Sequence, residues 1–235
     1  MSDQAEHRDI LESQRSEDRP HFKSLKKATI QTLPQSQIAD PSPLGLSAFA
    51  LTTFILSLIN LGTRELDQPN IVVGAAFAYG GLVQLLAGMW EMAKGNCFDA
   101  TAFSSFSGFW IGTAMIFTPG GFAIVETLSQ DSSSPFYNSI GIYFMGWFIF
   151  TFILVIRSLR STLASLVPFS SLDLTFLLLG IAYLSGDGHT NPNTACLRAG
   201  GAFGTMSAFA AWYIAAAGLL DSSKSYFRLP LCPLP

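Results

Sequence analysis

The sequence predicts an all-α membrane protein, a bundle of six transmembrane helices, and three observations support this fold class. Of its 235 residues, 49% are hydrophobic and only 12% are charged, whereas soluble domains average about 25% charged residues. The charged residues gather before residue 43 and in short connectors. Six apolar stretches remain, each close to the roughly 20 residues that a helix needs to cross the hydrocarbon of a bilayer.

These stretches cover residues 44–61, 71–93, 100–118, 139–157, 162–184 and 198–220. Inside a bilayer the backbone must satisfy its own hydrogen bonds, so each is expected to be a helix, within a transmembrane domain over residues 41–221. Residues 1–40 are expected to form a disordered tail, because they hold too little apolar surface to offset the entropy of ordering. Residues 222–235 are expected to form a short C-terminal tail.

Lysine and arginine residues predict the orientation of the bundle, because cytoplasmic connectors carry an excess of them. Only Arg64 and Arg198 fall on one side of the predicted bundle. The other side carries Lys23, Lys26, Lys27, Lys94, Arg157, Arg160, Lys224 and Arg228. Both tails are therefore expected in the cytosol.

Two predicted helices carry small residues at i, i+4 and i+8. These stripes are Ser104, Gly108 and Gly112 in the third helix, and Gly200, Gly204 and Ala208 in the sixth. Helices in lipid associate where small residues let their backbones approach closely. The stripes are expected to serve packing, either within one bundle or between subunits.

The first two predicted helices place polar side chains on single faces. Thr53 and Asn60 share a face with Phe49, and Gln84 shares one with Glu91. Polar groups are costly in hydrocarbon, so they face either a substrate path or a neighbouring helix. Both interpretations stay open, and Glu91 also has a lysine within one turn as an ion-pair partner.

Asp173 lies midway through the fifth predicted helix with no adjacent cation. An acidic residue at the centre of a bilayer costs about 2.5–3.5 kcal/mol on insertion scales. Asp173 is therefore a candidate for proton coupling, and the alternative is a neutral acid that bonds another helix.

The third predicted helix has an aromatic face formed by Phe103, Phe106 and Trp110, roughly opposite its small residues. Such a face ordinarily points toward lipid. Turned inward, it would form a hydrophobic constriction in a path, and such constrictions gate by excluding water. Periodicity alone does not choose between the two.

The sequence holds no pattern typical of catalysis. It lacks a His-rich metal site, a nucleophile–base pair and a Gly-rich phosphate loop, so we expect neither an enzyme nor a cofactor or metal site. Basic residues stand beside apolar stretches rather than on one face of a folded domain, which argues against nucleic-acid binding. The expected partners are the lipid bilayer and a small molecule that crosses it.

The sequence DPSPLGLSAF at residues 40–49 resembles the signature of the acetate uptake transporter family, usually NPAPLGL followed by Phe. The likeness continues through YGGLVQLLAGMWEMAKGN at 79–96, TAFSSFSGFW at 101–110, LDLTFLLL in the fifth helix and AFAAWYIAAAGLL in the sixth. The motif residues at the start are Asp40, Pro41, Pro43, Leu44, Gly45 and Leu46. The chain is identified as a member of this family, which includes succinate–acetate permeases of the YaaH type, and resembles its fungal acetate and ammonia-export branch.

The resemblance implies a homo-hexamer of six-helix protomers, each with its own path for small carboxylates and closed by a constriction at Phe49, Phe106 and Leu172. The expected function is a transporter or channel for acetate and similar small monocarboxylates at the plasma membrane, with Asp173 as the candidate proton-coupling group. Thr53, Asn60, Gln84 and Glu91 are the candidate path residues. The alternatives are a membrane acetate sensor or regulator with little flux, and a paralogue linked to ammonium export.

Three residues depart from the family pattern. Asp40 replaces Asn, Ser42 replaces Ala, and Phe106 replaces the usual Tyr. Without the tyrosine hydroxyl, the constriction holds nothing that can replace the hydration of a carboxylate. The sequence therefore predicts a drier path and a paralogue whose transport is slow, altered or absent.

Overall fold

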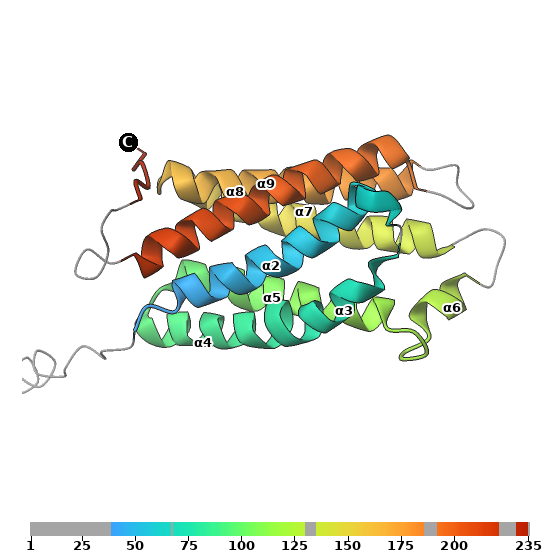
Figure 1. Ribbon diagram of the computed structural model, residues 1–235, viewed down its shortest axis with the longest axis horizontal. Coiled ribbons are helices and arrows are strands. Elements are labelled where there is room, and N and C mark those ends of the chain that lie inside the picture. The colour runs from blue at the N-terminus through green and yellow to red at the C-terminus, as the bar shows by residue number, and fades with distance from the viewer. Residues whose placement is uncertain (1–38, 67, 130–134, 186–191, 221–228, 235) are drawn as a thin grey trace, which may run out of the picture. The chain divides into compact units, whose positions relative to one another are not determined.

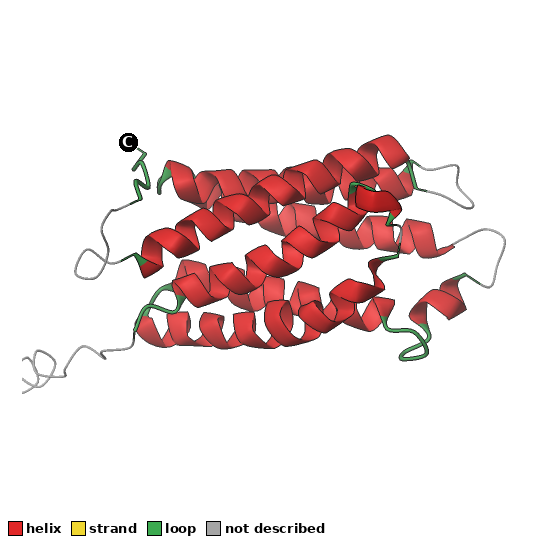
Figure 2. Ribbon diagram, viewed as in Figure 1, coloured by secondary structure: helices red, strands yellow, loops and turns green. Residues whose placement is uncertain are grey.

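The computed structural model describes residues 39–66, 68–129, 135–185, 192–220 and 229–234. Within these ranges the protein consists of helices packed side by side, and Figure 2 shows no strand among them (Figures 1 and 2). The predicted N-terminal tail lies outside the described residues, except for its last two positions.

Six segments of the described chain are long and apolar enough to cross a membrane, which confirms the predicted all-α architecture with six spans. Five are single helices: α2 (Ser42–Asn60), α5 (Cys97–Phe117), α7 (Pro135–Ser158), α8 (Leu163–Leu184) and α9 (Thr194–Leu219). The second span is composite, with η2 (Pro69–Ile71), α3 (Val72–Ala75), the π-helix η3 (Ala76–Val83) and α4 (Gln84–Lys94) in succession. The short elements η1 (Thr63–Glu65) and α6 (Ile124–Leu128) lie between spans.

Several helices begin before the apolar stretch that predicts them, because polar residues cap their first turns. The Asn96 side chain accepts from the Asp99 backbone N–H at the start of α5. The Asn193 side chain accepts from the backbone N–H groups of Ala195 and Cys196 in the first turn of α9. Such caps satisfy backbone donors that have no partner inside the helix, so α5 and α9 begin a few residues before their apolar stretches. Thr162 caps α8 in the same way by accepting from Ser165 N–H, but that helix begins within its predicted stretch.

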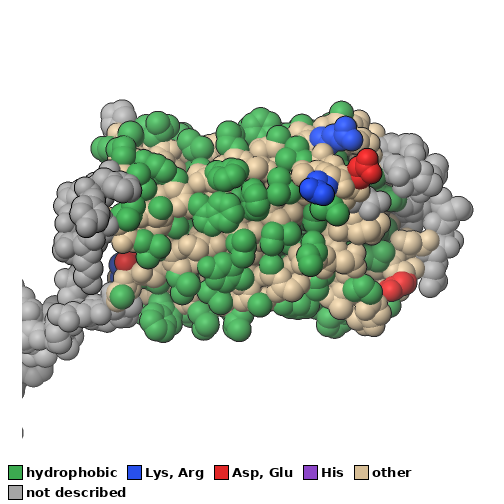
Figure 3. Space-filling view, in the orientation of Figure 1, with side chains coloured by type: hydrophobic (Ala, Val, Ile, Leu, Met, Phe, Trp, Pro, Cys, Tyr) green, Lys and Arg blue, Asp and Glu red, His purple; other side chains and the backbone are tan. Residues whose placement is uncertain are grey.

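The helices pack as neighbours, with α9 between α2 and α8, α7 against α8, and α4 against α5. We call the end that carries Asp40 and the connection between α4 and α5 the proximal end, and the end that carries η1 and α6 the distal end (Figure 1). Figure 3 shows hydrophobic side chains over the middle of the visible face and charged ones only near its ends. This distribution suits a protein whose middle faces hydrocarbon.

The two small-residue stripes have different surroundings. On α9, a Cβ added at Gly200 would stand 3.2 Å from the Leu179 side chain, and one added at Gly204 would overlap the Ser57 side chain of α2. That stripe therefore packs within the protomer. On α5, a Cβ at Gly108 would meet nothing within 4 Å among the described residues, so the middle of that stripe is open.

The end of the chain packs against the start of α8. The backbone N–H groups of Leu163 and Ala164 donate to the carbonyls of Cys232 and Leu231, at 2.8 and 3.3 Å. The first N–H groups of a helix lack partners within it, and this short segment supplies acceptors for two of them. Part of the predicted C-terminal tail is thus joined to the bundle, while 221–228 lie outside the described residues.

Candidate functional site

Three cavities follow one another through the bundle. The proximal cavity measures about 400 Å³ and the distal cavity about 870 Å³, and between them lies a middle cavity of about 20 Å³. The middle cavity shares Phe49, Phe106 and Leu172 with the proximal one, and Leu56, Asn60 and Leu179 with the distal one. A cavity of that volume holds about one water molecule, so two wide vestibules are separated by a short, nearly closed segment.

The three residues of the expected constriction meet at the boundary between the proximal and middle cavities. Phe49, Phe106 and Leu172 are 6%, 3% and 4% exposed. The rings of Phe49 and Phe106 are 5.8 Å apart, and Phe106 also contacts Phe150 and Phe176. Large rigid side chains packed in this way leave no open passage.

The aromatic face of α5 points into the protomer. Phe103, Phe106 and Trp110 are all buried, so the interpretation that this face contacts lipid is wrong. Phe106 contacts aromatic rings of α2, α7 and α8. Trp110 lies against Gly80 of the second span, and the small Ser104 lies against Gly88 of α4. The aromatic side chains of α5 therefore fill the interior of the protomer.

Buried polar atoms without a partner flank the constriction. On the proximal side, Gln84 is fully buried and lines the cavity, and neither Oε1 nor Nε2 has a hydrogen-bond partner among the described residues. On the other side, Thr53 Oγ1 and Trp110 Nε1 line the middle cavity and also lack partners there. An unsatisfied buried polar group costs about 1–3 kcal/mol, so such a cluster is typical of a binding site.

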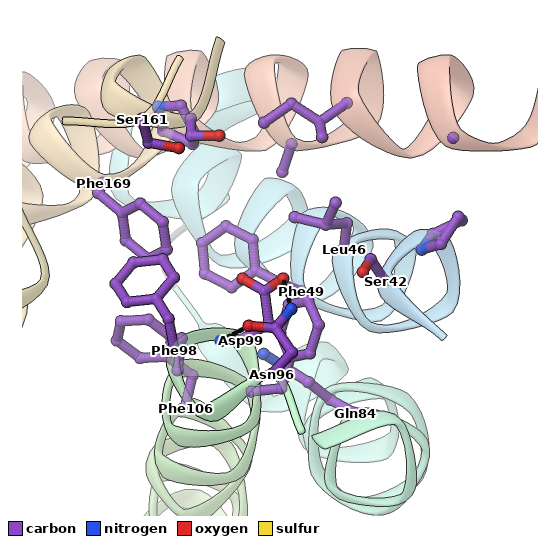
Figure 4. A pocket seen from close by; sticks show the side chains of 18 of the residues that line it. Ser42, Leu46, Phe49, Gln84, Asn96, Phe98, Asp99, Phe106, Ser161 and Phe169 are labelled. Atoms are coloured by element: carbon purple, nitrogen blue, oxygen red, sulfur yellow. Dashed lines mark hydrogen bonds between the residues drawn. The ribbon is translucent and has the colours of Figure 1, made fainter. Parts of the chain in front are cut away.

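Figure 4 shows Phe49, Gln84 and Asp99 pointing into the proximal cavity from three different helices. Asp99 accepts a 2.6 Å hydrogen bond from Asn96 Nδ2. Arg157 also lines this cavity, with its guanidinium 5.6 Å from the centre of the Phe98 ring. A cation held over an aromatic face gives the proximal mouth a positive group that attracts anions.

The distal cavity has an arginine of its own. Arg198 lines it together with Glu65, Glu126 and the half-buried Asn60, which reaches into the middle cavity as well. The rings of Tyr137 and Tyr183 stack 6.0 Å apart in its wall. The distal vestibule is therefore wide and aromatic, with charged groups of both signs.

Glu91 lies at the proximal end but lines none of the three cavities. Its Oε1 accepts a 2.6 Å hydrogen bond from Ser42 and lies 3.8 Å from Lys94 Nζ, while Oε2 has no partner among the described residues. The polar face that the sequence indicates on the second span is therefore divided. Gln84 lines the proximal cavity, and Glu91 joins the end of α4 to the start of α2.

Asp40 completes this proximal cluster. Lys94 Nζ donates to Asp40 Oδ1 at 2.7 Å, and Ser42 donates to the same oxygen. Burial acts to raise the pKa of Asp40, but the hydrogen bonds from Lys94 and Ser42 outweigh it and hold the pKa below its usual value of 3.8. The negative charge that departs from the family pattern is therefore balanced by Lys94.

Replacing Asp40 with Asn is expected to have a small effect. A carboxyl with a lowered pKa stabilises the folded protein above its ordinary pKa, and this contribution is lost as the pH falls through the folded-state value. The Asp40 and Lys94 side chains are 52% and 36% exposed, so the pair contributes less than about 1 kcal/mol. Melting curves at pH 7 and pH 3 should show a slight loss for Asp40→Asn at pH 7 and a smaller one at pH 3; equal losses at both would contradict the ion pair.

The remaining motif residues shape the start of α2. Pro41 is its N-cap. Pro43 is buried against α9, where a Cβ added to Gly218 would stand 2.8 Å from the Pro43 ring. Gly45 faces Phe103 of α5, and a Cβ added to this glycine would stand 2.7 Å from the Phe103 ring. Leu44 is exposed, and Leu46 lines the proximal cavity. The motif therefore seats the first span against α5 and α9 beside the cavity.

Asp173 is next to Leu172 in the chain but is not among the residues that line the cavities. Its side chain is buried, 8% exposed, and Oδ1 has no hydrogen-bond partner among the described residues. Its proton-coupling role stays a prediction. Two features that sequence reasoning missed are the π-helix before Gln84, which contains Gly80 and Gly81, and the Trp110 N–H.

The family model described as the GPR1/FUN34/yaaH family matches residues 22–235. The chain is 56% identical over 201 residues to acetate permease A from Emericella nidulans, covering 85% of this chain and 67% of that protein. It is 30% identical over 196 residues to the succinate-acetate/proton symporter SatP from Escherichia coli K12, covering 83% of this chain and 96% of SatP. The solved structure of the bacterial acetate channel SatP has a TM-score of 0.70 and 31% identity, covering 83% and 99% of the two chains.

Proposed function

The chain belongs to the GPR1/FUN34/yaaH family, and from this premise we propose that it transports acetate and similar small monocarboxylates through the path between its proximal and distal cavities. The observation that carries the proposal is the buried constriction of Phe49, Phe106 and Leu172 with unpartnered polar atoms on both sides. An integral membrane protein with transporter and channel relatives suits this role.

The polar atoms around the constriction suit a carboxylate. Acetate has an apolar methyl group and a carboxylate that accepts hydrogen bonds. The Gln84 amide, the Trp110 N–H and the Thr53 hydroxyl are donors, and they stand before and after the apolar ring. The substrate would exchange water for these donors on each side, so the path is less dry than the ring residues alone suggest.

Uptake of labelled acetate by liposomes that contain only this protein tests the proposal. A Leu172→Trp variant should block uptake by filling the constriction. The matched control is Leu174→Trp, two residues away on an outward-facing part of α8, which should transport normally. If the folded protein binds acetate but its liposomes take up no more acetate than protein-free liposomes, the transport proposal is contradicted and a sensor or regulator is favoured.

Phe106→Tyr should raise the acetate rate. A phenolic O–H at the constriction would bond the carboxylate where its hydration is lost, and lowering a barrier by about 1.4 kcal/mol raises a rate about tenfold. Initial uptake rates of the two proteins at one acetate concentration check this. An unchanged rate would mean that the ring edge of residue 106 does not face the passing substrate.

Asp173→Asn should flatten the pH dependence of transport in a protein that still folds and inserts. An unpaired acid inside a span is costly when charged, so binding and release of its proton are suited to coupling with a carboxylate. Uptake measured between pH 5 and pH 8 checks this in both proteins. Identical pH profiles would exclude Asp173 and leave the acid as a structural group in α8.

We also propose a homo-hexamer at the plasma membrane with both termini in the cytosol. The open surface at Gly108 supports a subunit contact at α5, since small residues favour close helix approach. Native mass measurement in mild detergent should give six copies, and a stable monomer or dimer would contradict it. Terminal tags should resist protease added outside intact cells.

A further inference from the structure

The second span contains a π-helix directly before Gln84. Residues Ala76–Val83 form η3, and the α-helical pattern resumes at Gln84. Single-turn π-bulges are the usual form of the π-helix and are frequent at functional sites. A π-helix of eight residues inside a membrane span therefore needs a contact that stabilises its hydrogen-bond pattern, or register.

Ser107 of α5 supplies that contact. Its hydroxyl donates a 2.7 Å hydrogen bond to the carbonyl of Gly81, and the side chain is fully buried. The same Gly81 carbonyl also accepts from the backbone N–H of Gln84, which bonds Tyr79 O as well. Ser107 thus donates to the same Gly81 carbonyl oxygen that accepts from Gln84, the first residue of α4.

The glycine pair brings α5 close enough for this bond. A Cβ on Gly80 would stand 2.8 Å from Thr52 Oγ1 and from the Trp110 ring, and one on Gly81 would stand 2.8 Å from Ile111. With no side chains there, the π-helix lies directly against α2 and α5. Its hydrogen-bond pattern is set by these neighbours as well as by its own sequence.

The register decides where Gln84 points. One residue of an α-helix turns by about 100°, so a change from the π to the α pattern before Gln84 would rotate its amide away from the proximal cavity. That amide is fully buried without a hydrogen-bond partner among the residues that the structure describes, and it lines the same cavity as Phe49 and Phe106. We propose that Ser107, through its hydrogen bond to Gly81, is a positioning residue that holds the Gln84 amide toward the transported carboxylate; this rests on the transport function proposed above.

Acetate uptake kinetics in liposomes test the inference. Ser107→Ala should raise the apparent KM about tenfold, as when a hydrogen bond to a charged ligand is lost, and should change the maximal rate much less. Combined with Gln84→Leu, the same substitution should change KM by less than about twofold, because the residue through which it acts is gone. Ser107→Cys keeps a weak donor of similar size and should lie between the wild type and Ser107→Ala.

The matched control is Ser207→Ala. Ser207 is equally buried and donates at 2.8 Å to the carbonyl of Pro168 on the neighbouring helix, so its hydrogen bond joins α9 to α8 and not to the span that carries Gln84. It should lose similar thermal stability and keep its KM. Equal KM shifts in Ser107→Ala and Ser207→Ala, or additive shifts with Gln84→Leu, would overturn the inference. Absence of uptake by the wild type would instead overturn the proposed function.

Should Ser107→Ala fail to fold, Ser107→Cys decides the question. A wild-type KM in that variant, or a KM shift that persists in the Gln84→Leu background, would exclude a positioning role. A shift that disappears in that background would support it.

Discussion

Gly201→Leu is expected to prevent the protomer from folding. A Cβ at this position would stand 2.7 Å from Ser57 O in the last turn of α2 and 2.8 Å from the backbone nitrogen of its C-cap, Leu61. Overpacking a core typically costs 1–3 kcal/mol when side chains can move aside. Here the obstacle is a helix backbone, so α2 and α9 would have to separate, and we expect a cost above about 3 kcal/mol. The yield of monodisperse protein in mild detergent should fall to almost nothing.

The matched control is Gly146→Leu in α7. Among the described residues nothing lies within 4 Å of where its Cβ would stand, and the position is exposed. This variant should purify normally with little change in melting temperature. Equal yields and melting temperatures for Gly201→Leu and Gly146→Leu would show that α2 and α9 do not approach as closely as the structure has them.

The spans were the most predictable part of the fold, because the thickness of hydrocarbon sets their length and the backbone leaves no choice but a helix. Their ends were less predictable, since the polar caps Asn96 and Asn193 carry no apolar signal. The π-helix could not be expected from composition. Its stabilising contact comes from Ser107, 26 residues further along the chain.

The candidate site was partly predictable for a similar reason. Gln84 stood out because an amide inside a span needs an explanation. Periodicity put Glu91 on the same face, but Ser42 reaches it from the start of another helix. A one-dimensional pattern shows that a polar group must be satisfied and does not show which distant residue satisfies it. For the small-residue stripes, likewise, the sequence left open which one packs inside the protomer.

Gln84→Leu is expected to change transport and stability in opposite directions. Its Oε1 and Nε2 are buried without partners among the described residues, and an unsatisfied buried polar group costs about 1–3 kcal/mol. Leucine removes both atoms at a similar volume, so the folded protein should be at least as stable as the wild type. A stability cost retained at one position is typical of a functional site.

At an acetate concentration below KM, uptake by Gln84→Leu should fall about 10- to 100-fold, since a hydrogen bond to a charged group contributes about 1.5–3 kcal/mol and each 1.4 kcal/mol is tenfold in affinity. The control is Thr151→Val. Thr151 is also fully buried, and its hydroxyl has no hydrogen-bond partner in the described part of the chain, but it is not among the residues that line the cavities. Thr151→Val should keep the wild-type uptake rate. If Gln84→Leu melts lower than the wild type and carries acetate at the normal rate, Gln84 is a structural residue of α4 and the path does not pass beside it.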